Sequence, residues 1–513
     1  SRWVSILLRR ALLSRVPAPA AVRPVDWVAD RALLLLRMGE ADGARMLVQA
    51  VDVDRYTPKM YAVAAQTALA TADPAALCPL ADAGAGLTDE PIWPVAQAIC
   101  AGLSGDSATA GVMLDQARSR RLGDTIDLQL AEKVLGTGVG GRRVVALDWS
   151  GVDHLTAYRF GLAGALAAPI PDELWSTVGL QVQAWRARTP TVMPADRLGA
   201  ARIAASLGVL SSAALVDLYG AVAETTDSQA LEASPAGQLG EAYAGDDRAA
   251  KMTALRQLWT ASSDPRDSYA GDILTARAAA RIDPDDALDS DAAKLIAAML
   301  SAGLDRQAAR WSGVVEAMSG SDADPAWALL AVGAPRPVVD TSEGRVASYV
   351  KRAGDDGLVR ARMLIAALAG LGRLSDSDAA TLAGRTGFAF DDNRWSRAIA
   401  LAASNRQPGT VALLAAVGMQ TQDWRAVPPA FLFHIIHALK AVGRGPEARM
   451  IAAEALTRTG AAMARTSWRS SVSSRCSRSK PAPRPTPSPP MPRTCAPPPS
   501  CSTAGSPRRV PMI

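Results

Sequence analysis

The chain has 513 residues, of which 49% are hydrophobic, so it has ample material for two or three ordinary domains or one elongated repeat array. Aromatic residues make up only 5%, while alanine is abundant and clusters of β-branched residues are scarce, which favours helices over strands. The net charge of +5 belongs to the last 53 residues, because the first 460 carry 46 basic and 50 acidic side chains. A mildly acidic body without a basic stripe excludes a phosphate-binding face, so we expect no nucleic-acid partner.

The chain opens with an apolar segment, residues 3–8, that meets Arg9 and Arg10 too soon for the core of a signal peptide. This pattern predicts an amphipathic helix and places any export signal upstream of the first residue. No uncharged apolar run approaches the roughly 18 residues that a membrane-spanning helix needs. The sequence therefore predicts no membrane span.

Four segments share one pattern, in which an apolar helix leads to a turn glycine and then to a second helix that opens with small residues. They are residues 32–47, 103–114, 299–311 and 437–451, with turn glycines Gly39, Gly105, Gly303 and Gly443. An alanine follows each glycine by five residues, namely Ala44, Ala110, Ala308 and Ala448. Glycine supplies the positive φ that ends a helix, and the alanine lets the second helix approach the first closely. Each segment is therefore predicted to be a helical hairpin.

This pattern resembles the helical hairpin of tetratricopeptide and related α-solenoid repeats of bacterial type. The hairpins recur at irregular intervals rather than every 34 residues, so the resemblance is to a tetratricopeptide-like array. It implies an all-α fold in which helix–turn–helix repeats are stacked as an α-solenoid, with the first helices of successive hairpins on the concave face.

Interruptions of the helical periodicity suggest how the body is divided. Glycine dominates residues 136–143, and further loops are predicted at residues 239–247 and 333–344. We expect amino-terminal helical repeats over residues 1–135, a central helical region over 136–335 and carboxy-terminal helical repeats over 336–460.

Residues 461–513 differ in kind, with twelve Pro, eleven Ser, three of the five Cys and no acidic residue. This composition predicts a disordered basic tail, since it cannot bury enough apolar surface to offset its ordering entropy. In an alternative reading frame of GC-rich DNA, residues 473–499 spell a peptide that resembles the amino-terminal DNA-binding helices of tyrosine site-specific recombinases. The resemblance implies that the tail is an out-of-frame overlap with a recombinase gene and has no function of its own.

Cys78 and Cys100 are the only cysteines of the body, and they fall on two helices predicted to be consecutive and antiparallel. A disulfide between them is geometrically allowed and would contribute roughly 3 kcal/mol. The alternative is a pair of buried thiols that pack as small hydrophobic groups. A bridge would favour the periplasm or cell envelope over the cytoplasm.

Aromatic residues concentrate in the centre of the chain, at Trp149, Tyr158, Phe160, Trp175 and Trp185. Aromatic and arginine side chains are favoured anchors of protein interfaces. We therefore name Trp149, His154 and Arg159 as a candidate partner-binding surface. Aromatic residues at this spacing also pack into cores, and that alternative stays open.

No catalytic or cofactor motif stands out in the sequence. His434 and His437 share a helical face, but no acidic or cysteine ligand accompanies them. The glycines of 136–141 lack the spacing and the preceding strand of a phosphate-binding loop. We expect no cofactor, no metal site and no enzymatic activity.

These observations favour a non-catalytic scaffold or adaptor that binds another protein, because each repeat of a solenoid extends a surface without closing a catalytic pocket. The alternative is a helical accessory module of a bacterial cell-wall lytic enzyme whose catalytic part is absent from this chain.

Overall fold

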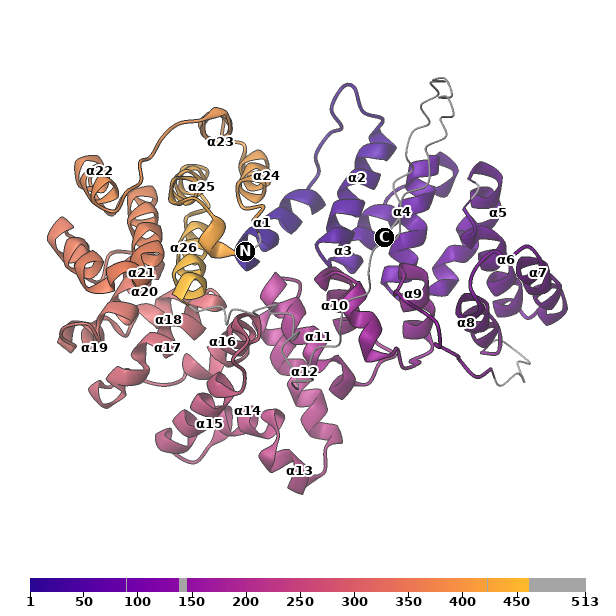
Figure 1. Cartoon of the computed structure of the whole chain (residues 1–513), viewed down its shortest axis with the longest axis horizontal. Coiled ribbons are helices and arrows are strands. Elements are labelled where there is room, and N and C mark those ends of the chain that lie inside the picture. The colour runs from indigo at the N-terminus through magenta and orange to yellow at the C-terminus, as the bar shows by residue number, and fades with distance from the viewer. Residues whose placement is uncertain (89, 138–144, 422, 461–513) are drawn as a thin grey trace, which may run out of the picture. The chain divides into compact units, whose positions relative to one another are not determined.

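The structure is a computed structural model that describes residues 1–88, 90–137, 145–421 and 423–460 (Figure 1). Within these ranges the chain forms 26 α-helices and five short 3-10 helices, and no strand. The predicted all-α fold class is confirmed. The predicted tail and its overlap with a recombinase gene lie outside the described residues, as do most of the glycines around residue 140.

The helices follow one another through short connections. The first eight are α1 (Arg2–Leu13), α2 (Pro24–Arg37), α3 (Ala41–Gln49), α4 (Pro58–Ala70), α5 (Cys78–Leu87), α6 (Ile92–Leu103), α7 (Ser107–Ser119) and α8 (Thr125–Leu135). The central ones are α9 (Ala157–Ala165), α10 (Leu180–Ala187), α11 (Pro194–Leu207), α12 (Ser212–Thr225), α13 (Ser228–Ala233), α14 (Pro235–Ala244), α15 (Arg248–Thr260), α16 (Pro265–Ala279), α17 (Asp289–Ser301), α18 (Asp305–Ala309), α19 (Ser312–Ala317) and α20 (Asp324–Gly333). The last six are α21 (Glu343–Leu371), α22 (Asp376–Arg385), α23 (Arg394–Ser404), α24 (Pro408–Gly418), α25 (Pro429–Ala441) and α26 (Gly445–Gly460). The 3-10 helices are η1 (Val53–Arg55), η2 (Pro74–Leu77), η3 (Asp172–Thr177), η4 (Asp286–Leu288) and η5 (Trp424–Ala426).

The four predicted turn glycines all lie between consecutive helices and all have positive φ, at 85°, 95°, 79° and 76° in chain order. The residue after each glycine donates its N–H back to the first helix, at 2.8–3.0 Å: Glu40 to Leu35, Asp106 to Ala101, Leu304 to Met299 and Arg444 to Leu439. This is the hydrogen-bond pattern of a glycine-ended helix. The alanines five residues after the glycines are at most 1% exposed, so they lie in the seam between the two helices. The helical hairpins are confirmed.

The predicted loop at 333–344 is largely found, whereas the one at 239–247 is largely helical and most of the one at 136–143 lies outside the described residues. Residues 334–342 separate α20 from α21, and α8 ends at Leu135. By contrast, α14 continues to Ala244. The Ser234 hydroxyl accepts the N–H of Gly237, and Pro235 stands at the first helical position, so a good helix start outweighs the two glycines inside the helix.

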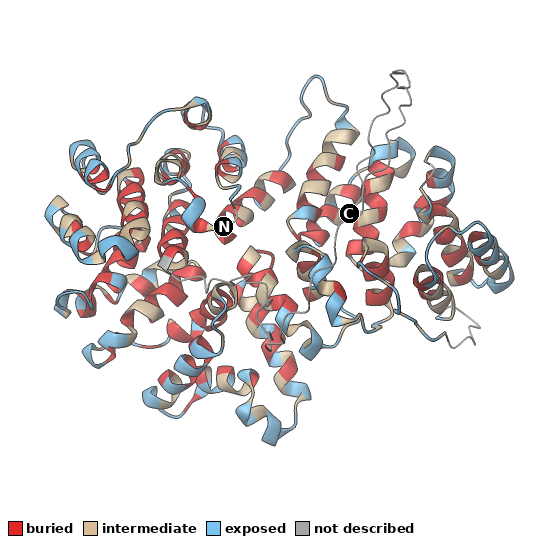
Figure 2. Cartoon of the chain, in the orientation of Figure 1, coloured by how far each residue is buried: buried red, intermediate tan, exposed pale blue. Residues whose placement is uncertain are grey.

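Residues Ser1–Ala462 form one compact unit, in which some described helices, such as α20, are almost wholly buried and others leave one face exposed (Figure 2). Its buried apolar residues form three clusters, and α1 contributes to two of them. Val4 and Leu7 join the cluster that includes α10–α12 and α14–α26. Leu8 and Leu12 join the cluster formed by α2–α6 with parts of α9 and α10. The third cluster lies among α6–α9.

The first helix also contacts the last one. Glu454 of α26 lies at the amino terminus of α1, where its carboxylate accepts hydrogen bonds from the Ser1 hydroxyl at 2.5 Å and from the Arg2 N–H at 2.8 Å. Arg458 donates to the same carboxylate at 3.1 Å. A carboxylate satisfies the free N–H groups of a helix start and interacts favourably with its dipole. The two terminal helices are thus joined by a buried polar contact.

Basic side chains repeatedly satisfy the free carbonyls at the end of a neighbouring helix. Arg31 donates to Leu12 O at 2.7 Å, at the end of α1, and Arg373 donates to Ala334 O at 2.5 Å, at the end of α20. Lys440 does the same for α21. Burial, and then the nearby Arg449, lowers the pKa of Arg373 to about 10, so this guanidinium still carries its charge at neutral pH.

Cys78, the first residue of α5, and Cys100, in α6, are joined by a disulfide with a Cα–Cα distance of 5.4 Å. The two helices pack side by side, and the bridge closes a loop with a sequence separation of 22. Constraint of a loop of this length in the unfolded chain stabilises the fold by about 3 kcal/mol. None of the helices in the described ranges is both long and apolar enough to cross a membrane.

Candidate binding pocket

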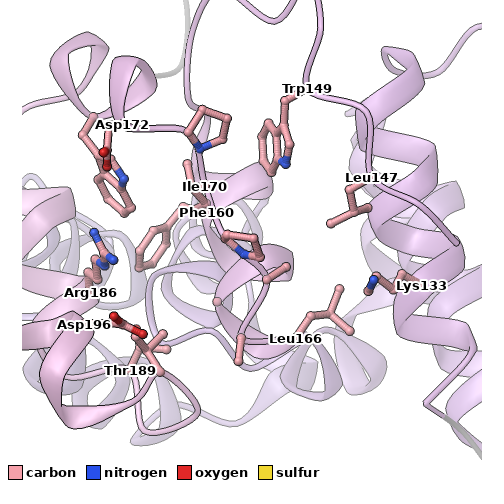
Figure 3. Close-up of a pocket in the computed structure, with 17 residues that line it drawn as sticks. Lys133, Leu147, Trp149, Phe160, Leu166, Ile170, Asp172, Arg186, Thr189 and Asp196 are labelled. Atoms are coloured by element: carbon pink, nitrogen blue, oxygen red, sulfur yellow. The ribbon is translucent and has the colours of Figure 1, made fainter.

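A pocket of about 850 Å³ opens among α8–α10, η3 and the segments that connect them (Figure 3). A volume of this size is typical of ligand sites. Its wall combines aromatic, aliphatic, proline and charged side chains. It is lined by Lys133, Leu147, Trp149, Phe160, Gly164, Leu166, Ala167, Ala168, Pro169, Ile170, Pro171, Asp172, Trp175, Arg186, Thr189, Val192 and Asp196.

The local sequence explains why the chain leaves a hollow here. Helix α9 ends at Ala165, and Ala167 takes a positive φ of 49°. Pro169 and Pro171 then prevent the next residues from continuing as a helix. The chain becomes helical again only at η3, which carries Trp175. The wall of the pocket is therefore an irregular segment between two helices.

Aromatic rings form the base of the pocket. Phe160 is only 1% exposed, and its ring meets those of Trp175 and Trp185 edge-on or tilted, with centroids 6.3 Å and 5.8 Å away. Trp149 lies on the opposite side and is half-buried. The Nε1–H of Trp175 is buried, with no hydrogen-bond acceptor in the described part of the molecule.

Two cations point into the pocket from opposite sides (Figure 3). The Arg186 guanidinium stacks over the Trp175 ring at 4.7 Å, and no carboxylate of the described chain lies within ion-pair distance of it. Lys133 donates to the carbonyl of Val145 at 3.2 Å. Both cations are half-buried, whereas Asp172 and Asp196 are exposed. The lining therefore combines two half-buried cations with two exposed carboxylates.

The structure does not place the three residues named as a candidate surface on one exposed surface. Trp149 lines the pocket. His154 is exposed; its ring lies against the neighbouring Asp153, and its carbonyl accepts a hydrogen bond from Arg159. The prediction for Arg159 is wrong, because its side chain is 2% exposed and so is not on a surface.

Arg159 instead connects two helices. Its Nε donates to Asp127 at 2.8 Å and its Nη1 to the carbonyl of His154 at 2.8 Å, while Asp124 is a further partner. Burial disfavours the charged guanidinium, but the hydrogen bonds and charges of the two aspartates raise the pKa of Arg159 above its ordinary value. Asp124 and Asp127 also cap the start of α8, so Arg159 fixes α9 to that end of α8.

Sequence reasoning grouped Phe160, Trp175 and Trp149 as aromatic residues but missed Lys133 and Arg186. Arg186 lies in the last turn of α10, where a basic residue is common. Its role depends on the ring of Trp175, which lies eleven residues earlier on a different element. No pattern in the amino-acid sequence indicates that Arg186 and Trp175 are in contact.

A smaller hollow of about 230 Å³ lies between α6, α8 and α9. Its lining is mainly apolar, with Ile92, Val95 and Leu122, and its one buried hydroxyl, that of Tyr158, already donates to the carbonyl of Asp127 at 3.2 Å. It offers few polar groups for recognition.

The two histidines predicted to share a helical face both lie on α25. His434 Nε2 is buried and lies 3.9 Å from Asp392, and burial lowers the pKa of this imidazole. No group of three or more His, Cys, Asp or Glu side chains is placed to hold a metal ion in the ranges that the structure describes.

No protein-family model, no curated protein and no solved structure matches this chain.

Proposed function

We propose that this protein is a non-catalytic scaffold or adaptor and that it docks a partner protein at the aromatic pocket. The observation that carries the proposal is the stack of Arg186 on Trp175, with the half-buried Trp149 across the same open hollow of about 850 Å³. Trp and Arg are the residue types that most often dominate binding energy at protein interfaces. The helices around the pocket are packed and supply a rigid support.

The lining favours binding over catalysis. Among the lining residues, the one hydroxyl group belongs to Thr189 and donates to the carbonyl of Trp185 at 3.2 Å. Neither histidine nor cysteine lines the pocket. Asp172 and Asp196 are exposed, whereas a carboxyl group that donates a proton in catalysis is normally held in a dry, apolar site.

A disulfide in the body is consistent with a protein that works outside the cytoplasm. We therefore propose the periplasm or cell envelope as the compartment. Partner recognition through a rigid, pre-formed pocket requires no large rearrangement of the helices.

Affinity purification of the full chain followed by mass spectrometry tests the docking site. The comparison is between the wild type, Trp149→Ala and a control, Met46→Ala, which truncates an exposed apolar side chain outside the pocket. At least one partner should be recovered with the wild type and Met46→Ala and lost, by tenfold or more, with Trp149→Ala. Circular dichroism should show equal helicity for all three proteins. An unchanged set of partners for Trp149→Ala would refute docking at the pocket.

A further inference from the structure

We infer that the pocket selects a peptide segment that carries one carboxylate beside apolar side chains. In this arrangement Arg186 pairs with the carboxylate, while Trp149 and Ile170 contact the apolar side chains. The inference rests on the proposed docking function and specifies the chemistry of the docked segment.

The first argument is the uncompensated charge of Arg186. Some partly buried guanidiniums of this chain are paired with a carboxylate, such as Arg202 with Asp267 and Arg449 with Asp305, and others donate to helix-end carbonyls, as Arg31 and Arg373 do. Arg186 is half-buried, and within the described residues the face of Trp175 is its one side-chain partner. A cation that loses water without gaining an anion is costly, so a carboxylate supplied by the bound segment is the natural complement. Guanidinium–carboxylate pairs are frequently bidentate, which adds to their specificity.

The second argument is the negative charge of the two aspartates in the pocket lining. Asp172 and Asp196 also line the pocket, and both are exposed. They repel a ligand with several negative charges, such as a nucleic acid or a polyphosphate, but leave room for a single carboxylate at the centre. The pocket thus discriminates by the number of charges as well as by their sign.

The third argument is the chemistry of the remaining wall. Trp149, Phe160, Ile170 and the two prolines present apolar surface, and the buried Nε1–H of Trp175 provides a donor without an acceptor. A peptide offers apolar side chains that pack on the apolar wall and backbone carbonyls that accept the hydrogen bond of the Trp175 N–H. A neutral oligosaccharide would leave the guanidinium without its anion.

Fluorescence polarisation with labelled peptides tests this selectivity. Three pools of hexapeptides differ at one fixed central position, which is Glu in the first pool, Gln in the second and Lys in the third. In every pool the flanking positions are Leu, Phe or Pro. The Glu pool should bind the wild-type protein about tenfold more tightly than the Gln pool, and the Lys pool most weakly. Arg186→Gln should abolish the preference for Glu over Gln, and Arg186→Glu should favour the Lys pool. Trp149→Ala should weaken binding of all three pools by a similar factor.

Arg306→Gln is the control, because it removes one exposed positive charge far from the pocket lining. It should leave the ranking of the pools unchanged. Equal binding of the Glu and Lys pools by the wild type would overturn the selectivity. Failure of every pool to bind, or binding of chitotetraose that Trp149→Ala abolishes, would overturn the peptide as occupant. The docking function is judged separately, by the partners that Trp149→Ala loses.

Discussion

The glycines that end helices are the residues from which the helical hairpins of this chain can be predicted. Gly39, Gly105 and their counterparts occupy a left-handed backbone position that L-residues with a Cβ adopt only at a cost. Among the residues that the structure describes, four that are not glycine take the same position at other helix ends: Ala72, Arg121, Ala167 and Arg406. The glycines could be predicted from the sequence, whereas these four could not, because alanine and arginine give no signal for positive φ.

Two glycine variants separate backbone strain from steric contact. A Cβ on Gly105 would meet nothing within 4 Å, whereas one on Gly39 would lie 2.7 Å from the Cβ of Ala184 and 3.2 Å from Val209. We expect Gly105→Ala to lower the free energy of unfolding by about 1 kcal/mol through backbone strain alone. Gly39→Ala should cost clearly more, because α2 and α10 must also move apart.

Urea denaturation followed by circular dichroism measures both changes. Arg406→Gly is the control of opposite sign, because it relieves the strained position on an exposed turn. Equal losses for Gly39→Ala and Gly105→Ala would show that the close approach to Ala184 carries no energy.

At the scale of the element, the sequence predicted local hairpins better than distant contacts. The hairpin pattern needs only a glycine, an alanine and helical spacing, all of which are local. The pocket depends on Trp149, Trp175 and Arg186, which come from an irregular segment, a 3-10 helix and α10. Arg159 shows the same limit, since its burial depends on Asp124 and Asp127, more than 30 residues earlier.

Helix α21 shows how a long element is fixed to its neighbour. It is bent at Gly354, which has a φ of 56°. Its first part is held against α20 by Asp324, whose carboxylate accepts hydrogen bonds from Arg345 at 2.8 Å and from Arg352 at 2.7 Å. Burial alone would raise the pKa of Asp324, but the hydrogen bonds and charges of Arg352 and Arg345 bring it below its ordinary value.

This contact should make stability depend on pH. Since the pKa of Asp324 is lower in the folded chain than in the unfolded one, the ion pairs stabilise the fold at pH values above the unfolded pKa of about 3.9. The contribution is lost as the pH falls through the folded pKa. Asp324→Asn should therefore lower the free energy of unfolding by about 2 kcal/mol at pH 7, and the difference from the wild type should shrink below about pH 4.

Urea denaturation at pH 7 and pH 3.5 provides the comparison, with Asp322→Asn as the matched control on an exposed neighbouring residue. A difference between wild type and Asp324→Asn that stays constant over this range would show that ionisation of Asp324 contributes nothing to stability.

At the scale of the whole body, α1 connects parts of the chain that are far apart in sequence. It contacts α2 and α3, which follow it, and also α11, α24 and α26. The sequence predicted an amphipathic helix at this place, but α1 is buried on two faces, with Val4 and Leu7 in one cluster and Leu8 and Leu12 in another. The contacts of α1 with the last helices could not be predicted from a local pattern, because they depend on how all the intervening helices stack.

Glu454 should control how firmly α1 is attached to α26. Glu454→Ala removes the acceptor for the amino terminus of α1 and leaves Arg458 and the N–H of Arg2 without their partner. Loss of one member of a buried polar contact of this kind costs about 3 kcal/mol. We expect α1 to detach more often in the variant, while the exposed Glu232→Ala should behave as the wild type.

Limited proteolysis with trypsin measures this detachment of α1 directly. In the wild type, cleavage near the amino terminus should occur after Arg15, which is exposed in the loop between α1 and α2, and not after Arg9 or Arg10, which lie within the helix. Arg9 and Arg10 are also held by ion pairs with Glu40 and Glu447. In Glu454→Ala, cuts after Arg9 and Arg10 should become frequent relative to cuts after Arg15, because a helix must unfold locally before trypsin can cleave it. If α1 stays protected from trypsin in the variant, its apolar contacts alone hold it in place, and the hydrogen bonds of Glu454 are not needed to attach it.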